Sequence, residues 1–564
     1  MEVYMDNYEI ADQFSLLSQL MDIHGENAFK AKSYSSAAFT IEKLATEIAD
    51  LPKEKIIALK GIGESVGNKI VEIIETGELG ILKDLIAGTP KGVLEMLTIK
   101  GLGPKKIHTL WKEAGIDTLE DLIEACQKNK LASQKGFTEK TQEKILESVA
   151  FKKQNSNRYL YAHVESFVEV FNIKIKEAFK NEKLEITGAF RRHLEIIEEL
   201  EWVTTIPKNE LKDFLLKSGF EIIKELPDTI TINPEGTPAI TFYITSDENF
   251  YVHIVKTSSS DEFLKEWKKI EIQQKEKTYK SEEDVFKKLD IPFIPSYLRE
   301  KKEIMATIKN IDLDNIIQTA DVKGLVHSHS NWSDGGHTIE QMANELIKLG
   351  FEYLVISDHS KAAYYAGGLS EEKILEQHEY IDTLNKKLKP FKIFKSIECD
   401  ILSDGSLDYS DEVLASFELV IASIHSNLQM NEEKAMKRLL GAIENPYVTI
   451  LGHMTGRRLL KRNAYPVDHK AVIDACAANL VTIEINANPQ RLDMKWEWID
   501  YALENNLFLS INPDAHTIDE FHNIKYGVLV AQKGGLTKEN NLSSLNLADF
   551  ETFLTKRKKL KGIT

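Results

Sequence analysis

Nine histidine and acidic residues in the carboxy-terminal half of the chain have the types and spacing of metal ligands. Each follows a short apolar segment or lies at its end, although the nine are spread over about 190 positions. Imidazole and carboxylate groups without thiolates suit Zn²⁺ or Mn²⁺, and a carboxylate can bridge two ions. The predicted ligands are His327, His329, Asp334, His359, Glu398, His425, His453, Asp514 and His516.

The chemistry predicted for such a site is phosphoester hydrolysis. Closely spaced divalent ions can bind the oxygens of a phosphodiester, activate a water molecule and stabilise the leaving alkoxide, so that no protein nucleophile is needed. We predict two to three divalent ions, Zn²⁺ or Mn²⁺, with Glu398 and Asp514 as catalytic residues. Arg457 joins them as a third, because a guanidinium group matches the geometry of a phosphate.

Seven short apolar segments, separated by helical stretches, must position these ligands. In a parallel βα barrel the strand ends of one polarity meet at a single mouth, which would bring the ligands together. The pattern predicts either such a barrel or a doubly wound sheet. The expected strands are 324–326, 353–356, 393–397, 419–422, 448–451, 481–485 and 507–511.

The residues around each ligand resemble the PHP (polymerase and histidinol phosphatase) phosphoesterase family. The matching segments are HSHSNWSDG (327–335), ISDHSK (356–361), IECDIL (397–402), SIHSN (423–427), NPYVTILGHMTGR (445–457) and NPDAH (512–516). The resemblance implies a distorted seven-stranded βα barrel with three ions at its mouth. It assigns one ion to His327, His329, Glu398 and Asp514, a second to Glu398, His425 and His453, and a third to Asp334, His359 and His516.

The amino-terminal half is helical and contains a repeated glycine motif. LKGIGESVGNKI (59–70) and IKGLGPKKIHTL (99–110) each place GxG before a helix, where backbone N–H groups can approach a phosphate. A tight turn would explain one copy, but two copies resemble helix-hairpin-helix modules that bind the DNA backbone. The predicted DNA-binding residues are Gly61, Gly63, Gly101, Gly103, Lys105 and Lys106. Upstream, residues 22–38 resemble the lyase-type domain of family X DNA polymerases.

The middle of the chain resembles the nucleotidyltransferase core of family X polymerases, but with altered catalytic positions. In ITGAFRRHLEIIEELEWVTT (186–205), Gly188, Arg191 and Arg192 match the family pattern. Where that family has a serine and three aspartates, this chain has Ala189, Glu199, Glu201 and Thr241. Since two-metal transfer needs carboxylates that hold both ions, we predict weak or absent polymerase activity. The alternative is that the two glutamates suffice to hold Mg²⁺ or Mn²⁺ there.

Composition is typical of a globular protein of several domains. The chain has 564 residues with a formal net charge of −17, which argues against coating of nucleic acid through bulk charge. No apolar run approaches the roughly 18 residues of a membrane span. The acidic start lacks signal-peptide features, and the three cysteines form no CxxC pair. These features predict a cytoplasmic protein without membrane contact, and we expect a monomer.

The whole chain thus resembles a bacterial family X DNA polymerase with a carboxy-terminal PHP domain. The expected domains are a lyase-like helical domain with the first hairpin (1–85), a second helix-hairpin-helix region (86–153), an α+β polymerase-like palm and thumb (154–300), a linker (301–320) and the PHP barrel (321–564).

The resemblance implies a DNA-repair enzyme that acts on gapped or 3′-ended DNA, mainly as a metal-dependent 3′–5′ exonuclease. Three alternatives remain: an active polymerase with exonuclease, a small-molecule phosphatase of the histidinol phosphate kind, and a non-catalytic DNA-binding scaffold. The two hairpin motifs argue against the phosphatase, and the complete ligand set argues against the scaffold.

Overall fold

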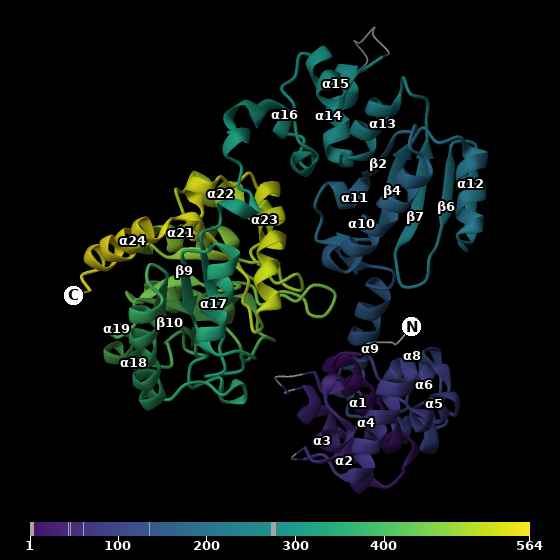
Figure 1. Ribbon diagram of the computed structural model, residues 1–564, viewed down its shortest axis with the longest axis vertical. Helices are drawn as coiled ribbons and strands as arrows, with labels where there is room; N and C mark the ends of the chain where they lie inside the picture. Colours follow the sequence, from purple (N-terminus) through teal and green to yellow (C-terminus); the bar gives the residue numbers. More distant parts are fainter. Residues whose placement is uncertain are drawn as a thin grey trace. The chain divides into compact units, whose positions relative to one another are not determined.

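The computed structural model describes residues 5–42, 44, 47–59, 61–132, 134, 136–271 and 278–563. It contains two compact units, Met1–Ser156 and Asn157–Thr564, which are described separately (Figure 1). Among the described residues, no helix has both the length and the apolar character of a membrane span.

The first unit is built from short helices, as the spacing of its apolar residues predicts. In the first helix, Phe14, Leu17 and Leu20 are fully buried, and Asp6 and Glu9 form a capping box at its start. The helices are α1 (Asn7–His24), α2 (Ala28–Glu42), α3 (Lys53–Ile57), α4 (Glu64–Thr76), α5 (Gly80–Ala87), α6 (Lys91–Met96), α7 (Pro104–His108), α8 (Leu119–Gln127) and α9 (Glu139–Gln154).

The second unit begins with a polymerase-like α+β core. Its five-stranded sheet has the order β2-β4-β7-β6-β5. The strands are β2 (Leu184–Thr187), β4 (Glu199–Thr204), β5 (Ile222–Leu226), β6 (Thr229–Ile232) and β7 (Ala239–Ile244). Helices α10 (Tyr161–Ala178) and α12 (Lys208–Lys217) pack on one face, where Leu200 and Trp202 are buried. Helix α13 (Phe250–Thr257) covers Val203 on the other face. Because side chains alternate along a strand, Glu199 and Glu201 lie on the α13 face.

The remaining elements of this core are short. They are α11 (Gly188–Arg191), the short pair β1 (Tyr159–Leu160) and β3 (Ile196–Ile197), α14 (Asp261–Glu271), α15 (Glu282–Lys288) and α16 (Ile304–Thr307). The segment predicted as a linker, 301–320, is ordered and packed: Ile308, Ile316 and Ile317 are at most 2% exposed. The backbone N–H of Ile317, buried with its side chain, donates to the Leu536 carbonyl at 3.0 Å.

The carboxy-terminal part is the predicted barrel of seven parallel strands. Their spatial order, β14-β13-β12-β11-β10-β9-β8, follows the sequence, and a bridge between Ser328 and Ala515 joins the two ends. This confirms the βα barrel over the doubly wound sheet. The strands are β8 (Gly324–Ser328), β9 (Tyr353–Ile356), β10 (Lys392–Asp400), β11 (Leu419–Ser423), β12 (Val448–Leu451), β13 (Thr482–Asn486) and β14 (Leu509–Asn512).

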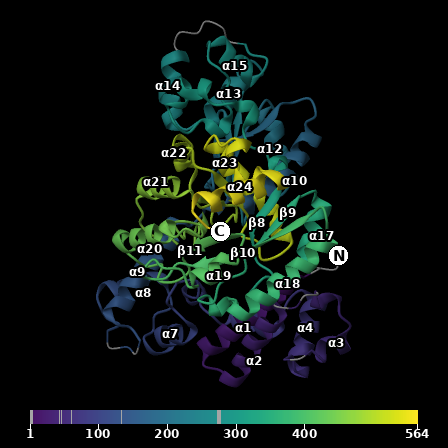
Figure 2. The same ribbon diagram turned by 90° about the vertical axis from the view of Figure 1, so that its left-hand side faces the viewer.

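Helices surround the strands (Figure 2). They are α17 (Ile339–Leu349), α18 (Glu371–Lys387), α19 (Asp411–Ala415), α20 (Glu432–Glu444), α21 (His469–Asn479), α22 (Ile499–Glu504), α23 (Ile524–Lys533) and α24 (Leu547–Leu560). Helix α24 fills the end of the barrel where the strands begin: Phe550 stacks on Tyr353, the first residue of β9, with ring centroids 4.5 Å apart. The strand ends that carry the predicted ligands form the opposite mouth.

Candidate metal centre and DNA-binding elements

All nine predicted ligands meet in one connected cluster at the mouth of the barrel. Its centre is the carboxylate of Glu398, near the end of β10, which is 1% exposed. Five imidazoles approach this carboxylate from the ends of other strands. The nitrogen-to-oxygen distances are 3.0 Å for His359, 3.1 Å for His453, 3.2 Å for His425, 3.3 Å for His327 and 3.6 Å for His329.

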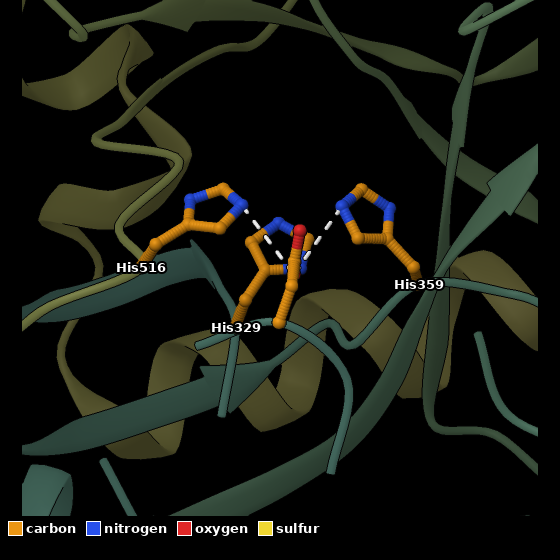
Figure 3. A group of neighbouring side chains, drawn as sticks. His329, His359 and His516 are labelled. Carbon is orange, nitrogen blue, oxygen red and sulfur yellow. Dashed lines mark ion pairs between the residues drawn. The ribbon is translucent and has the colours of Figure 1, made fainter. Parts of the chain in front are cut away.

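Two aspartates complete the cluster. Asp514 Oδ1 lies 3.2 Å from His329 Nε2 and 3.5 Å from His327 Nε2. Asp334 Oδ1 lies 3.6 Å from both His359 Nε2 and His516 Nε2, with His329 between the two rings (Figure 3). The cluster contains three groups in which all ligand atoms lie within 4.8 Å of one another. They are His329, Asp334, His359 and His516; His327, His329 and Asp514; and His359, Glu398 and His425.

The donor set fits divalent metal ions. His327 Nε2 and Glu398 Oε2 are buried without a hydrogen-bond partner, and a buried polar atom normally has one. Burial by itself raises the pKa of Glu398, but the neighbouring charges of His425, His327 and His359 lower it well below its usual value. An ionised carboxylate amid buried imidazoles is the arrangement that Zn²⁺ or Mn²⁺ sites use.

The backbone at two ligands adopts an unusual conformation. His327 has φ +62° and Asp514 has φ +53°, in the left-handed region that residues other than glycine rarely enter. Such positions cost of order 1–3 kcal/mol and concentrate at functional sites. The strain is consistent with ligands held in a geometry that the strands alone would not give.

Two further acidic residues, which the sequence reasoning missed, orient the imidazoles. Glu484 on β13 accepts from His327 Nδ1 at 2.5 Å and from the His453 backbone N–H at 3.0 Å. Asp400 accepts from His425 Nδ1 at 2.7 Å. A carboxylate on the second ring nitrogen fixes the orientation of a metal-binding histidine. The available signal was an acidic residue inside an apolar strand, as in TIEIN (482–486).

Arg457, which the sequence predicts as a phosphate-binding residue, makes contacts inside the protein instead. Arg457 is 4% exposed and pairs with Glu195 of the polymerase-like core at 2.6 Å, while its Nε donates to the Arg491 carbonyl at 2.8 Å. The guanidinium group of Arg457 therefore helps to hold the polymerase-like core against the barrel. Arg491, in the loop after β13, instead places its Nε 3.4 Å from Asp514 Oδ2. It was missed because nothing in the local sequence marks it.

In the polymerase-like core, Glu199 and Glu201 both accept hydrogen bonds from hydroxyl groups of β7. The Thr241 hydroxyl donates to Glu199, and the Tyr243 hydroxyl donates to Glu201 at 3.0 Å. Burial and the charge of Glu199 raise the pKa of Glu201. Gly188 has φ +66°, and a Cβ added to it would lie 1.8 Å from the Glu201 carboxylate, so glycine is required there.

The two arginines of this core are also paired within the chain. Arg191 contacts Glu282 at 2.7 Å and Arg192 contacts Glu300 at 2.9 Å. In the described part of the chain, the three groups of residues able to hold a metal ion all belong to the barrel. At the matched positions of the polymerase-like core, Glu199 and Glu201 are the two carboxylates, and each accepts a hydrogen bond from a neighbouring hydroxyl.

The two glycine motifs adopt the same backbone conformation. Gly61 and Gly101 have φ of +93° and +92°, while Gly63 and Gly103 both have φ −82° and immediately precede α4 and α7. Among the described glycines with ordinary φ, only Gly63 and Gly103 would place a Cβ with no atom within 4 Å. Neither backbone nor packing therefore requires glycine at these two positions. Lys105 is exposed, whereas Lys106 donates to the Gly101 carbonyl at 3.0 Å.

Comparison with known protein families agrees with these observations. Residues 5–79 match the family described as helix-hairpin-helix domain, residues 93–150 the SAM-like helix-hairpin-helix tandem, and residues 326–513 the PHP domain. The hairpin modules indicate a DNA-binding protein, and the PHP domain with its buried ligand cluster indicates a hydrolase that binds divalent metal.

Curated relatives extend the comparison to the whole chain. A probable phosphatase of Thermoanaerobacter sp. (strain X514) is 25% identical over 260 residues, 43% of this chain and 98% of that protein. The DNA polymerase/3′-5′ exonuclease PolX of Bacillus subtilis (strain 168) is 31% identical over 570 residues, covering 98% of this chain and 99% of that protein. From its hairpin modules to its barrel, the chain therefore belongs to the bacterial PolX family.

Proposed function

We propose that this protein is a DNA-end-processing phosphodiesterase that removes nucleotides in the 3′–5′ direction at the barrel site, with weak or absent polymerase activity. The observation that carries the proposal is the buried Glu398 carboxylate with five imidazoles within 3.6 Å. The Bacillus subtilis relative, whose name includes 3′-5′ exonuclease, supports the direction of attack.

The residues of the chain have separable tasks in this proposal. When bound, the divalent ions supply an activated water molecule and neutralise charge on the phosphodiester. Glu398, Asp514 and the histidines hold these ions, as the sequence predicts. Glu484 and Asp400 keep the imidazoles of His327 and His425 oriented. The guanidinium of Arg491, next to Asp514, is placed to bind a non-bridging phosphate oxygen.

Two other functions compete with this one. An active polymerase with exonuclease is favoured by the name of the Bacillus subtilis relative. Against it, Thr241 stands where the polymerase family has a catalytic aspartate, and its hydroxyl donates a hydrogen bond to Glu199. A small-molecule phosphatase is favoured by the Thermoanaerobacter relative, which matches 43% of the chain. A small-molecule phosphatase would have no use for the helix-hairpin-helix modules, so we prefer a DNA substrate.

The experiment that tests the proposal follows the direction of degradation. Purified full-length protein with Mn²⁺ is given single-stranded DNA labelled at the 5′ end or, separately, at the 3′ end. The proposal expects a ladder of shortening products from the first substrate and immediate release of mononucleotide from the second. Hydrolysis of small phosphate monoesters with no cleavage of either DNA would reject it in favour of the phosphatase.

DNA affinity should depend on the two glycines that the fold does not require. Gly63→Ala with Gly103→Ala is expected to weaken DNA binding about tenfold, because each Cβ keeps a phosphate from charge-assisted backbone hydrogen bonds. Thermal stability should stay equal or rise slightly, since alanine suits φ −82°. Fluorescence anisotropy with labelled duplex measures the affinity. The matched control is Gly80→Ala, outside both motifs; an equal loss of affinity there would contradict the interpretation.

The two arginines should separate a catalytic effect from a structural one. Arg491→Ala is expected to lower DNA cleavage about a hundredfold with little change in melting temperature, because Arg491 lies beside Asp514. Arg457→Ala should instead destabilise the protein by about 3 kcal/mol, since it leaves Glu195 buried without its partner. Calorimetry and cleavage assays on both variants distinguish these outcomes. The reverse pattern would restore the role that the sequence assigns to Arg457.

A further inference from the structure

An exposed pair of aromatic side chains lies on the loop that follows the second strand of the barrel. Tyr364 is 84% exposed and Tyr365 is 65% exposed, and their rings contact each other edge to face at 5.9 Å between centroids. Most exposed apolar side chains need no explanation, but two adjacent aromatics beside a catalytic mouth suggest a binding surface. The role proposed for the metal ligands makes no use of this pair.

The loop is held firmly to the metal centre. It begins directly after His359, and the backbone N–H of Leu369 returns to the His359 carbonyl at 2.8 Å, while that of Ser360 donates to the Glu398 carbonyl at 3.1 Å. Ala363 is fully buried and Ala366 is 6% exposed. Between these anchored positions, the two tyrosines point out of the fold. The rings are therefore presented by a fixed support.

Tyr365 also lies within electrostatic reach of the cluster. Partial burial and the charges of Asp400, Glu398 and Asp334 raise the pKa of Tyr365 to about 12, and Arg491 opposes that rise. An added Cβ at Gly367 would lie 3.3 Å from the carbonyl oxygen of Ser333, the residue before the ligand Asp334. The loop that carries the aromatic pair therefore lies beside the segment of the ligand Asp334, and the charge of Arg491 also acts on Tyr365.

We infer that Tyr364 and Tyr365 form a stacking platform for the 3′-terminal bases of single-stranded DNA. This role rests on the proposed exonuclease function. Every base has an aromatic face, so a tyrosine ring can hold successive bases without reading their sequence. Arg491 would meet the phosphate while the ring holds the base. Because a base must leave its duplex neighbour to stack here, the platform favours unpaired ends over blunt ends.

The test compares DNA with a substrate that has no base. Bis(p-nitrophenyl) phosphate, whose own rings can stack on tyrosine, is used only to check that the metal site is active. For each full-length variant with Mn²⁺, kcat/KM is measured for a single-stranded oligonucleotide and for the same oligonucleotide with abasic residues at its 3′ end. The ratio of the two is expected to fall roughly tenfold in Tyr364→Ala with Tyr365→Ala, mainly through KM for DNA. It should stay near the wild-type ratio in the double Phe variant. The matched control is Leu375→Ala, which removes a side chain that is 63% exposed on α18.

Each outcome decides one question. An unchanged ratio in the double Ala variant, with wild-type protein active on DNA, overturns the stacking platform alone. Wild-type protein that cleaves bis(p-nitrophenyl) phosphate but not DNA overturns the proposed function itself. If the double Ala variant does not fold, Tyr364→Leu with Tyr365→Leu keeps apolar bulk without a ring and should show the same fall. A retained ratio in that double Leu variant would reject stacking in favour of simple apolar contact.

A second readout follows the base directly. A 2-aminopurine placed at the 3′ terminus is expected to lose fluorescence on binding to the wild-type protein and to the double Phe variant, because stacking on a ring quenches it. The double Ala variant should bind the same oligonucleotide with little quenching. Equal quenching in all three proteins would place the terminal base elsewhere.

Discussion

Glu398→Gln is expected to reduce DNA cleavage about a thousandfold while the protein remains folded. The substitution keeps the shape of the side chain but removes the charge at the point where five imidazoles converge. A carboxylate that would hold metal at the centre of the site contributes several kcal/mol of transition-state stabilisation, and about 1.4 kcal/mol corresponds to a factor of ten in rate. Single-turnover cleavage of labelled DNA measures the effect, and metal analysis of the purified variant should show fewer bound ions.

The matched comparison is His516→Ala at the edge of the same cluster. His516 lies 3.6 Å from Asp334 and belongs to one of the three groups of ligand atoms, that of His329, Asp334 and His359. Glu398, by contrast, is approached by five imidazoles, so its loss should disturb more of the cluster. We expect a loss of about tenfold, well below that of Glu398→Gln. An equal or larger loss for His516→Ala would contradict the central position assigned to Glu398.

Nucleotide addition by the native polymerase-like core is expected to be undetectable. It must be measured in a protein whose barrel is disabled by His327→Ala with His329→Ala, because an active exonuclease would remove added nucleotides. One reason is Thr241, which stands where the family has an aspartate and whose hydroxyl donates a hydrogen bond to Glu199. The other is Glu201, whose carboxylate accepts a hydrogen bond from the Tyr243 hydroxyl. Primer extension on gapped DNA with Mg²⁺ or Mn²⁺ provides the measurement.

The restored site supplies the control for that assay. Ala189→Ser, Glu199→Asp, Glu201→Asp and Thr241→Asp, introduced together in the barrel-disabled protein, should raise extension at least about tenfold if only the ligands have changed. No gain would mean that the surrounding residues have changed as well. Template-directed extension by the barrel-disabled protein with its native Glu199, Glu201 and Thr241 would show an active polymerase instead.

Strand order and the gathering of the nine histidine and acidic side chains at one mouth could be predicted from the sequence, because both depend on simple rules. Apolar segments alternating with helices imply parallel strands, and parallel strands bring their carboxyl ends to one mouth. His425 and Glu398 could therefore be placed together although no local pattern connects them. The doubly wound alternative could not be excluded beforehand, because closure depends on the contact between Ser328 and Ala515.

Other features depend on contacts that the sequence does not encode locally. The positive φ of His327 and Asp514 is imposed by the assembled barrel. Arg457 was selected because it follows the predicted ligand His453 by four positions, whereas nothing in the local sequence marks Arg491. Only the folded structure shows that Arg457 pairs with Glu195 and that Arg491 lies beside Asp514. Tyr364 and Tyr365 carried no motif, and their position next to the metal centre emerged only from the anchored loop.

The most direct test of the account gives the full-length protein Mn²⁺ and gapped DNA with a 5′-labelled primer strand, with and without the four deoxynucleoside triphosphates, and resolves the products by size. The account predicts the same ladder of shortened products under both conditions, and no cleavage by the His327→Ala and His329→Ala variant. Primer strands that lengthen when nucleotides are present, or shortening that persists in that variant, would contradict it.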